Sequence, residues 1–232
     1  MPISSVATVV DNTVTAVKPH AEEITSQNDN IVDLQPQPQK DLQQQLEELE
    51  IVKTYMADSE NWLRRIAHAH VSDEKIVHHL TAGTLRGAGK LGVAPALFQS
   101  KDEKQILNVL HVGTSLCGHP NITHGGLLAT LLDETTAMNA IPNLPGKTGF
   151  TANLNINYRH PCIADQFIVI HSEVTSVEGR KAFVKATLKG IDGTLYVEAT
   201  ALFIAPKVAI SQLTEQLTQA KNASLAEAEA RA

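Results

Sequence analysis

One segment near the middle of the chain constrains the fold more than any other, because two glycines are followed at once by a run of apolar residues. After His124 the sequence reads Gly-Gly-Leu-Leu-Ala-Thr-Leu-Leu-Asp-Glu and reaches Glu134. Apolar side chains occupy nearly every position from Leu127 to Leu132, which predicts a helix buried on most sides. Each glycine costs about 1 kcal/mol relative to alanine in a helix. The pair therefore predicts that something approaches the backbone closely at this point.

The same segment combines a possible oxyanion site with an acid. The amides of Gly125 and Gly126, at the start of the helix, could donate to a carbonyl oxygen as it becomes an oxyanion. Asp133 follows nine residues after His124, with Glu134 next to it, and a buried carboxylate without a partner or a task is costly. Together they supply an electrophilic site and a base or nucleophile. The alternative is a glycine loop with positive φ and a solvated helix end that carries the two acids.

Five alternating segments in the sequence around this helix predict strands. They are residues 105–112 before the helix and 148–158, 166–176, 182–189 and 194–204 after it. Turn signals at Glu178-Gly179-Arg180 and at Asp192-Gly193 predict that the last three strands run antiparallel. This order indicates an α+β fold, not the alternating strands and helices of a nucleotide-binding sheet. No G-x-G-x-x-G or P-loop pattern is present.

The rest of the chain divides into segments of different composition. Residues 1–40 are predicted to be disordered, because no aromatic side chain occurs before Tyr55 and prolines are frequent. Residues 41–80 form a predicted helical lead-in, residues 81–206 the main domain and residues 207–232 a helical tail. The lead-in is predicted to contain three helices: an amphipathic one, a second from Ser59 and a short third one from Ser72. The first has the apolar stripe Leu42, Leu46, Leu49, Val52 and Met56, and the second has Trp62, Leu63 and Ile66.

Charge and hydropathy exclude two classes of partner. The chain has 25 Asp and Glu against 19 Lys and Arg, a formal net charge of -6, so it offers no broad positive field to nucleic acid. Its longest apolar run is about five residues, where a membrane span needs roughly 20. Two cysteines cannot make a disulfide framework, and no secretory or mitochondrial signal is recognisable. Cytoplasm is the default prediction.

Two other kinds of site receive less support from the sequence. Histidines 68, 70, 78 and 79 suggest a metal, but positions two apart point to different helix faces and no cysteine accompanies them, so no metal site is predicted. Cys117 could be a nucleophile, but without a basic neighbour a buried small residue is the better interpretation. A serine triad is unsupported, because no G-x-S-x-G elbow occurs.

The chain resembles the hotdog-fold acyl-CoA thioesterases. The His-Gly-Gly pattern followed by six residues and Asp133 is similar to the signature of the phenylacetic-acid-pathway type. The segments Thr151-Ala-Asn-Leu-Asn-Ile-Asn-Tyr158 and Glu198-Ala-Thr-Ala-Leu-Phe203 are similar to the mitochondrial long-chain acyl-CoA enzymes and their fungal relatives. The resemblance covers residues 81–206. It implies an antiparallel sheet wrapped around a long central helix, and it makes a mitochondrial location an alternative to the cytoplasm.

The resemblance also implies a homodimer or a tetramer of dimers, with active sites at the dimer interface, and acyl-CoA as substrate with no cofactor. Gly125 and Gly126 would polarise the thioester carbonyl, His124 would shape the oxyanion end, and Asp133 of the partner subunit would activate water or attack directly. The resemblance further implies roles for other residues. Thr151 would assist, and Asn121, Glu134 and Arg159 are candidate substrate-binding residues, with Arg180 and Lys181 as further candidates for the CoA phosphates. One departure is Gly118, which stands where the phenylacetic-acid type has an asparagine that Asn121 could replace.

Two other functions fit the same fold. A non-catalytic acyl-CoA-binding or regulatory protein would keep the fold without needing Asp133, because fold alone does not establish activity. A hotdog hydratase would use an Asp and His pair. The Asp73-x4-His78 spacing lies far before the central helix, so the hydratase is the less favoured of the two.

Overall fold

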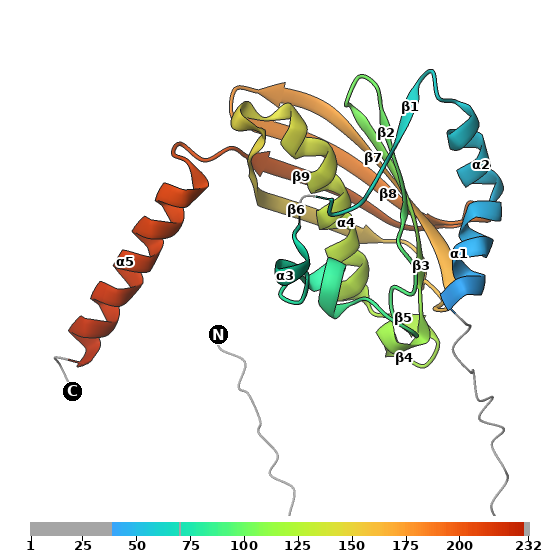
Figure 1. Ribbon diagram of the computed structural model, residues 1–232, viewed down its shortest axis with the longest axis horizontal. Helices are drawn as coiled ribbons and strands as arrows, with labels where there is room; N and C mark the ends of the chain where they lie inside the picture. The colour runs from blue at the N-terminus through green and yellow to red at the C-terminus, as the bar shows by residue number, and fades with distance from the viewer. Residues whose placement is uncertain (1–38, 70, 230–232) are drawn as a thin grey trace, which may run out of the picture. The chain divides into compact units, whose positions relative to one another are not determined.

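The computed structural model describes residues 39–69 and 71–229 (Figure 1). The prediction of disorder for residues 1–40 falls almost entirely outside the described residues. Gln39 and Lys40, the two exceptions, open a helix.

A seven-stranded antiparallel sheet forms the centre of the structure, in the order β1-β2-β3-β7-β8-β9-β6. The five predicted strands are present, and the last three run antiparallel as predicted. Strands β1 and β2 extend the sheet beyond β3 and were not predicted. The bounds are β1 Trp62–Arg65, β2 Ala96–Ser100, β3 Gln105–Val112, β6 Phe150–Tyr158, β7 Gln166–Glu178, β8 Lys181–Gly190 and β9 Leu195–Ile204. A separate hairpin pairs β4 Cys117–His119 with β5 Ile122–Thr123.

Helix α4, Gly125–Ala140, packs against one face of this sheet (Figure 1). Side chains alternate between the two faces of a strand, and Leu110 of β3 faces α4, with which it shares one core cluster. The same cluster contains Leu127, Leu128, Leu131 and Leu132 of α4, together with Ile168, Ile170, Leu188 and Val197 of the sheet. The predicted buried helix and the sheet around it are therefore confirmed, and this is the α+β hotdog arrangement.

Buried polar side chains also join α4 to the sheet. The Asn108 side-chain amide on β3 donates to the Thr135 hydroxyl at 3.0 Å, and the Asn139 amide donates to the Ser172 hydroxyl at 3.0 Å. All four residues are buried. Hydrogen bonds of this kind have directional requirements that leucine packing lacks, so they fix the rotation of α4.

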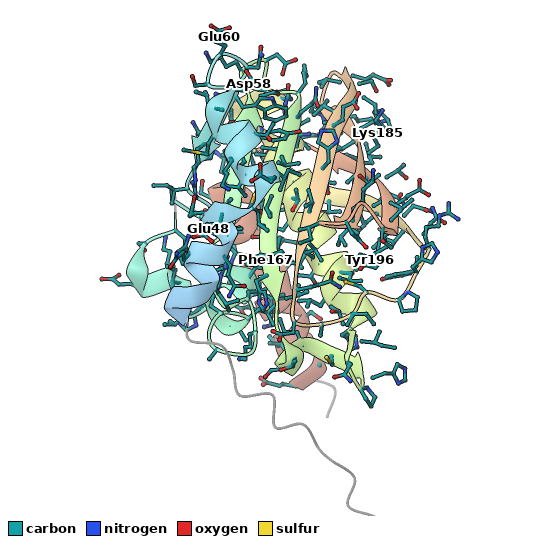
Figure 2. The ribbon with its side chains drawn as sticks, turned by 90° about the vertical axis from the view of Figure 1, so that its right-hand side faces the viewer. Glu48, Asp58, Glu60, Phe167, Lys185 and Tyr196 are labelled. Carbon is teal, nitrogen blue, oxygen red and sulfur yellow. The ribbon has the colours of Figure 1, made fainter. Side chains whose placement is uncertain are left out.

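The opposite face of the sheet is partly covered by α1, Gln39–Glu48, and α2, Glu50–Ala57 (Figure 2). A second core cluster lies under them and includes Phe167, which Figure 2 labels, with Leu42, Leu46, Val52, Leu107 and Val109. Lys185, also labelled there, lies on a part of the sheet that these helices leave exposed.

The lead-in differs from its prediction in two places. The first helix is divided at Leu49, whose extended backbone (φ -60°, ψ 131°) separates α1 from α2. The second predicted helix is wrong, because Trp62–Arg65 form β1 and pair with β2. The free edge of β2 satisfies their backbone groups, and the Trp62 ring packs edge-on against Tyr55, with ring centroids 4.6 Å apart. A short apolar pattern cannot distinguish these outcomes.

The remaining elements are short apart from the tail. A helical turn α3, Asp73–Ile76, precedes a π-helical turn η1, Leu80–Thr84, and α5 comprises Ile210–Glu229. The 3-10 turns are η2 Thr114–Leu116, η3 Ile141–Asn143 and η4 Pro145–Lys147. Among the described helices, none combines the length and the apolar character needed to cross a membrane.

Replacement of Leu46 tests whether the lead-in is part of the folded core. Leu46 is fully buried, so Leu46→Ala is expected to lower the free energy of unfolding by about 2–5 kcal/mol. Leu217→Ala is the matched control, because Leu217 on α5 is 63% exposed, and its effect should stay within about 0.5 kcal/mol. Urea unfolding followed by circular dichroism measures both. Equal, small effects would mean that α1 does not contribute to the cooperative core.

Candidate functional site

The N-terminal end of α4 is shaped by His124 and its close neighbours. His124 is the N-cap, and its Nδ1 accepts a hydrogen bond of 2.9 Å from the Gly126 N–H. A Cβ on Gly126 would lie 2.9 Å from His124 Cε1, and a Cβ on Gly118 would lie 3.0 Å from His124 Cδ2. A side chain at either position would therefore crowd the imidazole and displace it from its present place. Gly118, which replaces an expected asparagine, makes room for His124.

Of the two glycine amides predicted to face a substrate, only one is available in this chain. The Gly126 N–H donates to His124, whereas no described residue accepts a hydrogen bond from the Gly125 N–H. The Tyr158 hydroxyl donates to the Gly125 carbonyl oxygen at 2.8 Å and so ties the helix start to β6. The Gly125 N–H at this helix end carries partial positive charge and can interact with a developing negative charge.

A cavity of about 500 Å³ opens beside this helix end. His124, Gly125, Leu128 and Arg159 are among the residues that line it, and Asn121 is not. Asn121 forms the turn of the β4–β5 hairpin with φ 61°. The Arg159 guanidinium is paired with the Glu198 carboxylate at 2.7 Å. Asn121 thus has a structural role in the hairpin turn and does not line the cavity. Arg159 is held in an ion pair but does line the cavity.

The predicted acid and the predicted threonine do meet. The Thr151 hydroxyl on β6 donates to Asp133 Oδ1 at 2.9 Å. Asp133 is partly exposed and Thr151 is exposed, because β6 is the last strand of the sheet. A carboxylate that accepts a hydroxyl hydrogen bond in a fixed direction and keeps its second oxygen free is suited to activate water or to attack a carbonyl carbon.

Asp133 and the free Gly125 amide do not reach the same atom within one chain. Eight residues separate them along α4, and a rise of 1.5 Å per residue puts them about 12 Å apart. A single thioester group is far smaller than this distance. Within one chain, the Gly125 N–H and the Asp133 carboxylate therefore cannot act on the same thioester group.

Glu134 points away from Asp133 and is held by the lead-in. Its carboxylate is hydrogen-bonded to His68 Nε2 and accepts a hydrogen bond of 2.6 Å from the Thr81 hydroxyl. Burial raises the pKa of Glu134, but the hydrogen bonds from His68 and Thr81 together with nearby imidazole charge outweigh it, and the pKa lies below its usual value. The alternative of a solvated helix end is wrong at this residue, because α4 continues to Ala140.

The sequence did not predict that His68 and Thr81 contact Glu134. The partners are 66 and 53 residues apart in the chain, and no local spacing relates them. The other residues that were considered have ordinary surroundings. Cys117, interpreted from the sequence as a buried small residue, is only half-buried at the start of β4, and the Arg180 guanidinium donates to the carbonyl oxygen of Ala205.

Comparison with known proteins gives a consistent set of matches. Residues 120–197 match the model of the thioesterase superfamily. Acyl-coenzyme A thioesterase THEM4 of Mus musculus is 44% identical over 115 residues, which cover 49% of this chain and 49% of the mouse protein. An uncharacterized protein of Schizosaccharomyces pombe is 34% identical over 120 residues, 50% of this chain and 69% of the relative. An uncharacterized mitochondrial protein of Candida albicans is 26% identical over 141 residues, 58% of this chain and 63% of the relative.

The match to the mouse protein is partial. The chain spans about half the length of that curated relative, which is 49% covered. The matched family region includes His124, Gly125, Gly126, Asp133 and Thr151.

A pair of alanine substitutions tests the capping role of His124. Gly126→Ala should displace the imidazole from its cap, whereas a Cβ on Gly125 would lie 3.6 Å from the Tyr158 ring, an ordinary contact. Both changes gain the same helix propensity, so Gly126→Ala is expected to be less stable than Gly125→Ala by about 0.5–2 kcal/mol, the usual value of an N-cap. Urea unfolding measures the difference. Equal stabilities would show that the His124 side chain does not cap α4.

Proposed function

We propose that this chain, which belongs to the thioesterase superfamily, hydrolyses acyl-coenzyme A thioesters to a free acid and coenzyme A. The observation that carries the proposal is the Asp133 carboxylate, oriented by Thr151 at 2.9 Å on the exposed edge strand β6. The name of the mouse relative, an acyl-coenzyme A thioesterase, supports the substrate class.

The helix start would stabilise the charge that develops on the thioester oxygen. Attack on the carbonyl carbon puts negative charge on its oxygen, and the Gly125 N–H is a preorganised donor at the positive end of the α4 dipole. His124 holds the neighbouring Gly126 amide and so fixes the direction of the first turn. The Tyr158 hydroxyl bond to the Gly125 carbonyl oxygen keeps the same turn against β6.

Asp133 would act as general base towards water or as nucleophile towards the carbonyl carbon. In either case the Thr151 hydroxyl orients one carboxylate oxygen and leaves the other free to react. The thiolate of coenzyme A leaves readily, so the site needs no strong general acid. The natural acyl group would be selected in the cavity beside Leu128 and His124.

A second copy of the chain would complete each site. Strand β6 has β9 on one side only, so its outer backbone groups are open to pairing, and the large apolar side chains Phe150 and Tyr158 are about half exposed at its ends. Two β6 strands related by a two-fold axis run antiparallel, which sets the Thr151 end of one against the Tyr158 end of the other. Asp133 of one copy would then lie near Gly125 of its partner.

The location of this activity would be the mitochondrion. The Candida albicans relative carries that location in its name, whereas the cytoplasm remains a prediction from the sequence. Microscopy of the tagged full-length protein with organelle markers distinguishes the two.

Replacement of the acid tests the activity directly. Asp133→Asn keeps the size of the side chain but removes its basicity, so kcat/KM for thiol release from a panel of acyl-CoAs should fall by about 100-fold or more. Glu74→Gln is the control, because Glu74 is exposed and has no side-chain partner among the described residues. Saturable acyl-CoA binding without release by the wild-type chain would instead favour a binding protein.

A proline at Gly125 tests the oxyanion donor and the shared site together. Gly125 is the first residue of α4, where proline is tolerated, and His124 has the extended backbone that proline requires of its predecessor (φ -61°, ψ 128°). Gly125→Pro removes this N–H and adds ring atoms beside it, and it should lower kcat by about 100-fold or more, while Gly125→Ala adds a Cβ but retains the donor.

The two inactive variants can also restore each other. In mixed dimers of Asp133→Asn and Gly125→Pro, one of the two sites receives an intact acid and an intact amide, so random mixing should recover about a quarter of wild-type activity. Co-expression with two different affinity tags isolates the mixed dimers. Isolated mixed dimers with no activity above that of the separate variants would place both groups in the same subunit.

A further inference from the structure

The lead-in and α4 meet at a cluster of metal-binding side chains that the proposed catalytic site does not use. His68 and His79 come from the lead-in and Glu134 from α4, and one ligand atom of each lies within 4.8 Å of the others. The two imidazole rings stack edge to face, with centroids 4.9 Å apart. Neutral imidazole and carboxylate are the ligands that zinc and similar divalent ions bind in proteins.

The hydroxyl oxygen of Thr81 lies between these three side chains. It is 3.3 Å from His68 Nε2, 3.4 Å from His79 Nδ1 and 2.6 Å from Glu134 Oε1. In a tetrahedral zinc site with bonds near 2.0–2.1 Å, neighbouring ligand atoms are about 3.3 Å apart. The distances from Thr81 to the two imidazoles match this separation. The second carboxylate oxygen of Glu134 accepts no hydrogen bond from the described residues and is available to turn towards an ion.

The cluster is sheltered and its backbone is held firmly. The His68 side chain is 8% exposed, that of Glu134 is 20% exposed, and Thr81 is buried. Gly83 approaches the Ile76 carbonyl so closely that a Cβ would lie 2.0 Å from the oxygen. The Arg86 guanidinium donates to the carbonyl oxygens of Thr81 and Val93, at 2.9 and 2.7 Å. A π-helical turn, a rare element that is often found at functional sites, carries Thr81.

We propose that His68, His79 and Glu134 bind one divalent transition-metal ion, such as zinc, with the Thr81 hydroxyl or water as fourth ligand. The ion replaces the 3.2 Å hydrogen bond from the Ala82 N–H to His79 Nδ1 and leaves the ring proton on Nε2. Its role is structural, because it joins the lead-in to α4 on the side away from Asp133. The sequence predicted no metal here, since the ligands are separated by 11 and 55 residues in the chain.

The neighbouring histidines provide a matched pair of variants. His79 belongs to the cluster, whereas His78 is exposed and lies outside it. The full chain, stripped with a chelator, is titrated with Co²⁺ while its visible absorption is recorded, and then with Zn²⁺ in competition with a chromophoric chelator. Wild type and His78→Ala are expected to bind one equivalent and to show the absorption of a four-coordinate cobalt ion. His79→Ala should bind at least about tenfold more weakly.

Glu134→Gln separates loss of metal binding from misfolding. It keeps the size of the side chain and an oxygen acceptor for Thr81 while removing the anionic ligand. It should also lose metal affinity by about tenfold or more, with an unchanged circular dichroism spectrum. Zn²⁺ should raise the melting temperature of wild type and of His78→Ala but not of the cluster variants. Absence of stoichiometric binding by wild type, or equal affinities in His78→Ala and His79→Ala, would overturn the proposal and leave a hydrogen-bonded contact only.

Discussion

The rotation of helix α4 about its own axis is the constraint on which the rest of the structure depends. Consecutive residues of an α-helix point about 100° apart, so Asp133 and Glu134 reach Thr151 and His68 only at one rotation. Apolar packing alone permits small rotations, since leucines tolerate several arrangements. The buried hydrogen bonds from Asn108 to Thr135 and from Asn139 to Ser172 do not. They give each of the two acids its own set of neighbours.

The sequence predicted the elements whose pattern is local. The apolar run of α4 and the alternating side chains of β3, β7, β8 and β9 are sufficient to predict these elements. The reason is that burial of one face directly imposes the helical or strand repeat on the sequence. Strand β1 could not be predicted in the same way. The four residues Trp62–Arg65 are too few to show a helical or strand repeat in hydrophobicity. Their conformation is decided by pairing with the open edge of β2. The break at Leu49 likewise depends on how two helices fit one sheet face.

The residue types and their spacing along α4 were enough to name the candidate site residues of that helix. The family resemblance named Asp133 and Thr151 separately, and the structure shows the hydrogen bond that joins them, while their catalytic roles stay predictions. The difference between Gly125 and Gly126 was not predictable, because it depends on a side chain that folds back onto the helix it precedes. The contact of Glu134 with His68 and Thr81 joins segments that only the tertiary fold brings together. Sequence spacing alone therefore could not predict this cluster, although His68, His79 and Glu134 were each candidate residues by type.

The uneven cover of the outer sheet face bears on how many copies can assemble. Helices α1 and α2 occupy the apolar half of that face, and the other half carries ion pairs between Glu173 and Lys185 and between Arg159 and Glu198. Back-to-back packing of two sheets across this half would strip water from both pairs, and such desolvation commonly exceeds the attraction it strengthens. The lead-in helices thus cover one half of this face, and charged side chains occupy the other half. The exposed part of this face is therefore poorly suited to burial against a second sheet.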